Sequence, residues 1–262
     1  MIARKWRRPS PWPRPWIGSL AWTLGLAFLA WNVVSLDVDA ARLARGLGRL
    51  GTVVAKAFPP DFSRVELIVS GVVESVEIAT LSTVLGVLLG IPVAVLAARN
   101  VAPLPVYAGG RAVVTLGRTL HELILAIILV KAVGFGPLAG VLTLTVGAVA
   151  SFAKLLAEQI ETIDRGPIEA IRATGASRGA VLVYGVLPQA LPRIVGLSIY
   201  QWDVHLRHST IIGIVGAGGI GATLYNAFSR YDYDFALAIL IVIVAIVLLG
   251  EAVSAVARAR VQ

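Results

Sequence analysis

The sequence predicts an all-α protein that crosses a membrane several times. Of its 262 residues, 57% are hydrophobic and only 15% are charged, and the mean hydropathy is +0.83. Soluble domains contain about 25% charged residues. Several apolar stretches are also long enough, at about 20 residues each, to cross a bilayer as helices. The composition therefore excludes a disordered chain and argues against an ordinary soluble enzyme.

Four windows contain no charged residue, and each predicts a spanning helix. They are 15–36, 78–98, 132–153 and 235–250, the last extended by its neighbours to 233–256. A helix is expected because lipid offers no hydrogen-bonding partner to an unpaired backbone group.

Two further apolar segments, 112–132 and 190–212, contain charged residues. Such segments also fit buried helices of a soluble domain. Because four uncharged spans surround them, we interpret them as spans that face a protein-lined interior. The prediction is a polytopic membrane protein with six transmembrane helices.

The ends of the chain predict its orientation. Residues 1–16 contain five Lys/Arg and no acidic residue, so the start is expected to stay in the cytoplasm. Six spans return the C-terminus, with Arg258 and Arg260, to the same side. The alternative is a secretory signal peptide, but 15–36 is longer than a typical signal core and no clear small-residue cleavage site follows it.

The first outer connection, before residue 65, departs from the positive-inside tendency. Its basic residues are Arg42, Arg45, Arg49, Lys56 and Arg64. Its apolar residues Ala41, Leu43, Leu47, Leu50 and Val54 have near-helical spacing. We therefore expect an amphipathic helix along the outer surface, which Pro59-Pro60 ends.

Two further features exclude classes of function. The chain has no cysteine, so no disulfide, thiolate nucleophile or Cys-based metal site is expected, and we predict no metal site. The net charge is +8, but the basic residues are scattered around the spans instead of forming one soluble face. Nucleic-acid binding is therefore not expected.

The polar segment 158–189 predicts a cytoplasmic loop with two short helices. Gly166 is the expected N-cap of the first helix, and Gly175 can take the left-handed conformation that closes it. Ser177 is the expected cap of a second helix that ends at Val186, before Leu187-Pro188. Packing alone would explain such a helical loop, and it is also what a membrane protein uses to contact a soluble motor.

This loop resembles the coupling motif of ABC-importer permeases, the transmembrane subunits of ATP-driven importers. The motif is Glu-Ala-Ala, three residues, Gly, nine residues, Ile, one residue and Leu-Pro. Its spacing is complete here, with Ile171 in place of the second Ala and Gly185 in place of the Ile. The first change is expected to alter the fit in the ATPase groove. The ATPase-coupling residues that the resemblance implies are Glu169, Ala170, Ile171, Gly175, Leu187 and Pro188.

The resemblance narrows to the permeases of phosphonate transporters. It is carried by EAIRATGASRGAVLVYGVLPQALP, YQWDVHLRHSTIIGIVGAGGIG, LLGIPVAVLAARN and RTLHELILAIILVKAVGFGPLAG. It implies a type I permease core of five helices over 65–257, preceded by an additional segment, 1–64, that contains the amino-terminal helix. The family has proline where His121 stands, so the kink at that position is expected to be missing.

The same resemblance implies partners and a location. Two permease copies would pair in the cytoplasmic (inner) membrane of a bacterium, in contact with lipid. Two ABC ATPase subunits would dock below and bind ATP and Mg, while this chain carries no cofactor and is not itself an enzyme. An external substrate-binding protein would deliver a phosphonate or a related phosphorus oxyanion.

A glycine-rich segment follows the fifth predicted span. It matches G-x-G-x-x-G, but no strand precedes it, so a dinucleotide site is not expected. The resemblance places the segment near the subunit interface and the external gate, and tight helix packing is the alternative explanation. The glycines concerned are Gly216, Gly218, Gly219 and Gly221.

Charged residues inside the predicted spans are candidates for a substrate path, because such residues are costly in a membrane unless paired or hydrated. Arg118 and Glu122 are four residues apart, as are Asp203 and Arg207, so each pair is expected on one helix face. Each pair is also explained by mutual neutralisation alone. We predict Arg207 as the main contact of a passing oxyanion, with Asp203, His205, His208 and Ser209 around it.

Other functions fit the same motifs. Permeases for phosphite, phosphate or a methionine-like amino acid share the core pattern. The chain lacks the G-x-x-x-x-G-K-[ST] phosphate-binding loop, so a partner must supply the energy. An intramembrane hydrolase with Ser209 as nucleophile and His205 or His208 as base is a distant alternative, because Asp203 lies on another side of the helix.

The predicted orientation can be tested with reporter fusions. Fusions after Asp61 and after Gly136 are expected to report an external position, and a fusion after Ala176 an internal one. An external signal at Ala176 would remove the assignment of the coupling loop.

Overall fold

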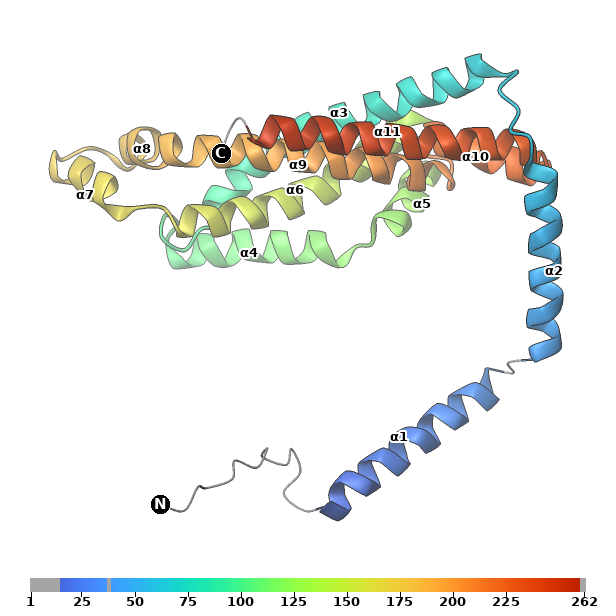
Figure 1. Ribbon diagram of the computed structural model, residues 1–262. Coiled ribbons are helices and arrows are strands. Elements are labelled where there is room, and N and C mark those ends of the chain that lie inside the picture. Colours follow the sequence, from blue (N-terminus) through green and yellow to red (C-terminus); the bar gives the residue numbers. More distant parts are fainter. Residues whose placement is uncertain (1–14, 37–38, 260–262) are drawn as a thin grey trace, which may run out of the picture. The chain divides into compact units, whose positions relative to one another are not determined.

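The computed structural model describes residues 15–36 and 39–259, which contain helices, turns and no β-strand. The basic start 1–14 and Arg260 lie outside the described residues. The chain divides into two compact units, one up to Ala55 and one from Lys56 onward. The first unit contains α1 (Pro15–Ser35) and most of α2 (Ala40–Ala57), which are coloured blue in Figure 1.

The second unit is a bundle of long helices with a short-helix segment at one end (Figure 1). Its elements are α3 (Val65–Leu96), α4 (Leu104–Thr119), α5 (Glu122–Val133), α6 (Pro137–Glu161), α7 (Arg165–Ala173), α8 (Arg178–Val181), the π-helical turn η1 (Leu182–Val186), α9 (Leu187–Gly213), α10 (Ile220–Ser229) and α11 (Tyr233–Ala259).

Helices α3 and α6 form the centre of this unit, where small residues let them approach closely. A Cβ atom on Gly86 would lie 2.3 Å from Ala148 Cβ, and one on Gly90 would lie 2.9 Å from the Phe152 ring. Ser82 of α3 donates a hydrogen bond to the carbonyl of Val141 of α6 at 3.3 Å. Helix α9 packs against both helices and completes the core.

The number of spans agrees with the prediction. Within residues 15–36 and 39–259, five helices are long and apolar enough to cross a membrane, and a sixth span results if α4 and α5 count as one. These two helices are bent by 85° where they meet, so the predicted continuous span 112–132 is wrong. The structure also extends the second predicted span toward its N-terminal side, because α3 begins at Val65.

Arg64 joins the start of α3 to the turn between α10 and α11. Its guanidinium lies 2.7 Å from Asp232, 3.4 Å from Asp61 and 3.7 Å from the centre of the Phe235 ring. The hydrogen bond from Arg64 lowers the pKa of Asp232, and hydrogen bonds from Ser63 lower the pKa of Asp61. Both carboxylates therefore stay ionised at neutral pH and keep this end of the bundle together.

The opposite end of the bundle is held by Glu161 at the end of α6. Its Oε1 accepts hydrogen bonds from the backbone N–H of Arg99 at 2.8 Å and from the Arg111 guanidinium at 2.9 Å. The Asn100 side chain donates to the carbonyl of Ile160 at 2.8 Å. These contacts fix the turn between α3 and α4 against α6.

The α3–α6 contact predicts unequal effects of two glycine substitutions. Gly86→Ala is expected to destabilise the purified protein by about 1–3 kcal/mol, because the new methyl group overlaps Ala148. Gly196→Ala is the control, because Gly196 also lies inside a helix but has open space around it. Thermal unfolding in detergent measures both, and equal stability of the two variants would contradict the close packing.

Candidate functional site

The segment between α6 and α9 contains the predicted coupling motif. Asp164 caps α7, because its Oδ1 accepts a hydrogen bond from the N–H of Gly166 at 3.0 Å. The predicted cap Gly166 is therefore wrong: the carboxylate two residues before it satisfies the free N–H group. Gly175 has the expected left-handed φ of +78°. Ser177 caps α8 by accepting from the N–H of Ala180 at 3.3 Å, as predicted.

The second helix of this segment does not end at Val186. From α8 the chain continues through the π turn η1 into α9 without a break. Pro188 lies in the first turn of α9, directly after the π turn, and the chain stays helical on both sides of it. The predicted stop before Leu187-Pro188 is therefore wrong, because proline is tolerated at this position.

The coupling segment is fastened to the start of α9 by one glutamine. Gln189 Oε1 accepts from the N–H of Asp164 at 3.1 Å. Its Nε2 donates to the carbonyl of Asp164 at 3.2 Å and to that of Gly185 at 2.8 Å. Ile168 of α7 is buried, while Glu169 and Ala170 of the same helix are exposed.

The two departures from the coupling motif lie against each other. A Cβ atom on Gly185 would lie 3.4 Å from Ile171 Cδ1 and 3.4 Å from the backbone of Ile168. Ile171 also packs on the buried cluster that contains Ile168 and Val186. The large residue thus fills space that the small one leaves, and its side chain points inward. The effect of Ile171 on the fit in an ATPase groove stays a prediction, because this residue is only partly buried.

A groove of about 800 Å³ lies beside α7 and α8. The turn between α3 and α4 forms its other wall. Its charged and polar lining consists of Asn100, Arg165, Glu169, Arg172 and Arg178. The coupling segment therefore presents both an exposed helix and a mainly basic depression to the solvent.

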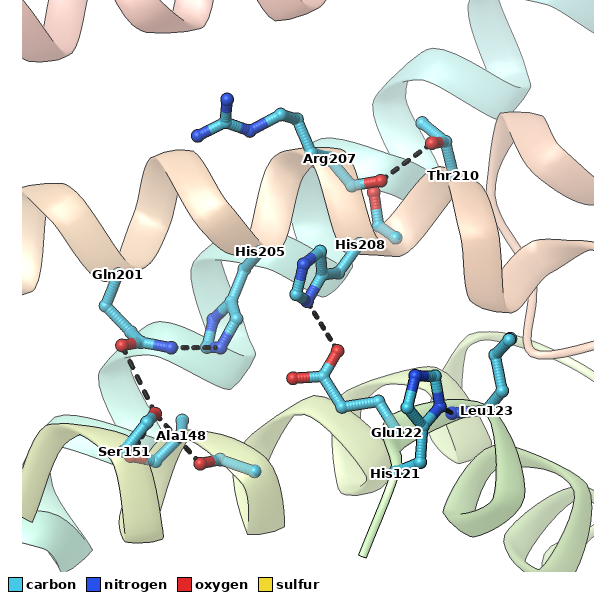
Figure 2. Close-up of polar contacts among 12 residues, drawn as sticks. His121, Glu122, Leu123, Ala148, Ser151, Gln201, His205, Arg207, His208 and Thr210 are labelled. Carbon is cyan, nitrogen blue, oxygen red and sulfur yellow. Dashed lines mark hydrogen bonds and ion pairs between the residues drawn. The ribbon is translucent and has the colours of Figure 1, made fainter. Parts of the chain in front are cut away.

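The polar residues of α9 face in two directions (Figure 2). His205 is fully buried and lies 2.9 Å from both Gln201 Nε2 and Thr83 Oγ1. Gln201 also accepts from Ser151 of α6 at 3.5 Å. Arg207 extends away from this side of the helix in Figure 2. The predicted path residues therefore separate into a histidine side and an arginine side.

The histidine side includes the bend between α4 and α5. His208 Nδ1 lies 2.5 Å from Glu122 Oε2, which joins α9 to the first residue of α5. His121 caps α5, because its Nδ1 accepts from the N–H of Leu123 at 3.3 Å. The kink expected to be missing is therefore present: a capping side chain replaces the proline.

The bend also overturns the predicted Arg118–Glu122 pair. Leu120 and His121 have extended backbone angles, so the two charged residues belong to different helices. Arg118 is exposed near the end of α4, and within residues 15–36 and 39–259 it has no ion-pair partner within 4 Å. The four-residue spacing implies one face only in a continuous helix.

The arginine side of α9 carries the predicted Asp203–Arg207 pair. Arg207 Nη2 donates to Asp203 Oδ2 at 2.6 Å, so the pairing expected from the spacing is present. The Asp203 side chain is only 6% exposed and its other oxygen has no partner, whereas Arg207 is 43% exposed. The carboxylate is thus fixed inside the protein, and part of the guanidinium is available to a ligand.

Ser209 is buried and donates to the carbonyl of Leu206 at 2.8 Å. His205 is already engaged by Gln201 and Thr83, and His208 lies against Glu122. The described residues therefore contain no histidine that activates Ser209, and the hydrolase alternative has no geometric support.

The glycine segment forms a tight turn between α9 and α10. Gly216, Gly218 and Gly219 all have positive φ, of +90°, +83° and +75°. A Cβ atom on Gly221 would lie 1.9 Å from the carbonyl oxygen of Thr210. Because a helix precedes the turn, the dinucleotide motif is excluded, and both the sharp reversal and the close helix contact require glycine.

The hydrogen-bond partners of this turn and of His205 were not predicted from the sequence. Ser75 of α3 accepts from the N–H of Ile220 at 2.9 Å, and Thr83 and Ser151 supply the contacts described above. Single hydroxyl residues inside apolar helices give no recognisable pattern, so only the packing of α3, α6 and α9 identifies them.

The described residues form an all-helical, polytopic membrane protein with a short-helix segment between α6 and α9. Residues 90–262 match the model of the family described as binding-protein-dependent transport system inner membrane component. The chain belongs to this family.

Individual relatives extend the comparison over most of the chain. The phosphite transport system permease protein PtxC of Stutzerimonas stutzeri is 40% identical over 243 residues, covering 92% of this chain and 88% of the relative. The phosphate-import permease protein PhnE of Mycolicibacterium smegmatis is 41% identical over 210 residues, covering 79% of this chain and 40% of that protein.

A solved structure shows the same fold. A chain of the methionine ABC transporter MetNI, in an inward-facing conformation, superposes with a TM-score of 0.68 at 26% identity. The superposition covers 77% of this chain and 99% of that chain. The all-α, type I permease fold predicted from the sequence is confirmed.

The contact between Ile171 and Gly185 predicts non-additive substitution effects. Gly185→Ile is expected to destabilise the protein by about 1–3 kcal/mol, because a Cβ atom there already touches Ile171 and Ile168 and the atoms beyond it need further space. The double variant Ile171→Ala/Gly185→Ile is expected to recover part of that loss. Thermal unfolding of the single and double variants measures the coupling, and strictly additive effects would contradict the paired arrangement.

Proposed function

We propose that the chain is the permease subunit of an ATP-driven ABC importer for a phosphorus oxyanion such as a phosphonate, phosphite or phosphate. Two observations support this substrate class. The named relatives with about 40% identity are a phosphite and a phosphate permease. The half-exposed Arg207 also offers a planar guanidinium, which suits a doubly charged oxyanion.

A methionine-like amino acid is the second candidate substrate. The similarity to the MetNI chain, which extends over 77% of this chain, favours it. Uptake assays with the cognate external binding protein separate the two classes. Transport of a phosphorus oxyanion and not of methionine supports the first proposal, and the reverse result contradicts it.

The proposed energy source lies on a separate ATPase subunit, which binds ATP and Mg. Glu169 and Ala170 are exposed on α7, so this helix is available to enter a groove on such a partner. Leu187 and Pro188 are exposed at the same end of the molecule. The groove lined by Arg165, Arg172 and Arg178 offers the partner a second, basic contact.

The proposed assembly contains two copies of this chain, two ATPase subunits and an external binding protein in a bacterial cytoplasmic membrane. Both termini lie in the cytoplasm. The glycine turn Gly216–Gly221 then lies at the external side, and we assign it to the gate or to the interface between copies.

Arg207 is the proposed contact of the anion along the path. An arginine whose side chain is 43% exposed inside a span is costly if it faces acyl chains. The cost disappears if this face borders water or a second copy. Asp203 neutralises part of the charge, which keeps the binding weak enough for release.

The remaining predicted path residues have different assignments. His205 and Ser209 are fully buried and engaged within the chain, so we assign them to packing. His208 and Glu122 hold the bend between α4 and α5. The exposed Arg118 is a second candidate cation for the anion.

The coupling proposal predicts the effect of two substitutions. Glu169→Lys reverses the charge on the exposed face of α7, and Gly175→Val puts a β-branched residue where φ is +78°. Both variants are expected to insert normally, to lose most ATPase co-purification and to reduce uptake by about tenfold or more, as a loss of 1.4 kcal/mol would. Normal co-purification and uptake in both variants would contradict the assignment.

The path proposal predicts an asymmetry between the members of the Asp203–Arg207 pair. Arg207→Ala is expected to abolish most uptake, because it removes the cation and leaves a buried carboxylate that repels the anion. Asp203→Asn is expected to be milder, because Arg207 keeps its charge. The substrate-stimulated uptake rate in vesicles measures both effects.

The double variant Asp203→Asn/Arg207→Ala separates the two roles of Arg207. If the arginine serves the anion, uptake stays low although no charge is left unpaired. Recovery of wild-type uptake would show that the pair only stabilises helix packing.

A further inference from the structure

Helix α2 carries its charges on one face. Its basic residues Arg42, Arg45, Arg49 and Lys56 fall within about 60° of arc at about 100° per residue. The helix itself contains no acidic residue. Asp39 lies just before it, where its Oδ1 accepts from the N–H of Ala41 at 2.8 Å and its Oδ2 lies 3.5 Å from the Arg45 guanidinium, so the other three basic residues provide the net charge. One side of α2 is therefore a continuous basic stripe.

A second stripe of α2 is apolar. Leu43, Leu47, Leu50 and Val54 also fall within about 60° of arc, displaced by about 140° from the basic stripe. The exposed fractions of the three leucines are 64%, 63% and 58%. Side chains of this kind need an apolar environment to cover them.

The helix also contains three glycines that weaken it. Gly46, Gly48 and Gly51 have no atom within 4 Å of a Cβ position, so none of them is required for close packing. Glycine inside a helix is less favourable than alanine by about 1 kcal/mol. A helix of this composition gains stability when a surface covers its apolar stripe.

The position of α2 along the chain indicates which surface that is. It begins only five residues after the end of α1, whose 20-residue apolar stretch is long enough to cross a membrane. When α1 spans the bilayer, α2 therefore starts at the level of the lipid headgroups. A second copy of this chain would bring an equally basic helix and would be repelled.

We propose that α2 is an interfacial helix that lies on the membrane and binds anionic phospholipid headgroups. Its leucines enter the boundary between headgroups and acyl chains, and its arginines attract the phosphate groups. Each basic residue near an anionic surface contributes about a fivefold gain in membrane partition. The proposal does not depend on the transported solute.

The test uses the full chain, which has no native cysteine, so single cysteines can be labelled selectively. Leu47→Cys carries an environment-sensitive fluorophore on the apolar stripe. Gly48→Cys is the matched control, because it is the next residue and lies about 130° away from that stripe. Both proteins are reconstituted in phosphatidylcholine vesicles with and without phosphatidylglycerol, each containing nitroxide-labelled acyl chains.

Strong quenching at Leu47→Cys and weak quenching at Gly48→Cys are expected, with at least a twofold increase at Leu47→Cys when phosphatidylglycerol is present. Adding Arg42→Gln, Arg45→Gln and Arg49→Gln is expected to remove the increase. The elution volume of the purified variants checks that they remain folded.

Three outcomes would overturn the proposal. Equal quenching in the two vesicle types excludes recognition of the anionic headgroup. Protection of Leu47→Cys that requires the external binding protein indicates a protein partner. Efficient disulfide formation between two Leu47→Cys chains indicates that a second copy covers the stripe.

Discussion

The close approach of α3 and α6 is the constraint on which the rest of the core depends. Gly86 and Gly90 leave the space that Ala148 and Phe152 occupy. One turn away, Thr83 of α3 and Ser151 of α6 face α9 and supply partners for His205 and Gln201. In a membrane those polar groups have no water to replace a lost partner. The position of α9, and of the charged pair it carries, thus follows from a contact that the missing side chains of Gly86 and Gly90 make possible.

The sequence predicted the features that depend on composition over a long stretch or on spacing within one helix. The length of the apolar stretches predicted the spans. The four-residue interval between Asp203 and Arg207 predicted that these two residues lie on one face of a helix. The bend at His121 was missed because its cause is a cap combined with a contact from Glu122 to His208, which is distant in the sequence. The predicted Arg118–Glu122 pair was wrong for the same reason, because residues four apart lie on one face only where the helix between them is unbroken.

In the candidate site, too, local features were predicted and contacts between distant residues were not. The coupling motif was recognisable because its residues are close together in the chain, and Ser177 and Gly175 act locally as expected. The cap Asp164 was missed because glycine and aspartate both suit such a position. The mutual fit of Ile171 and Gly185 could not be inferred from either residue alone, because fourteen positions separate them and only the folded loop brings them together.

The unbroken helix from Arg178 to Gly213 has a mechanical consequence. Its 36 residues correspond to about 54 Å at about 1.5 Å per residue. No loop interrupts it, because the π turn keeps the chain helical up to Pro188. A movement of α8 along the helix axis therefore reaches Arg207, about four fifths of the way along, through backbone that stays helical, with the π turn and Pro192 as the points where the helix can bend. Because Asp203 and Arg207 lie on the same helix, any shift of that helix carries the ion pair as a unit.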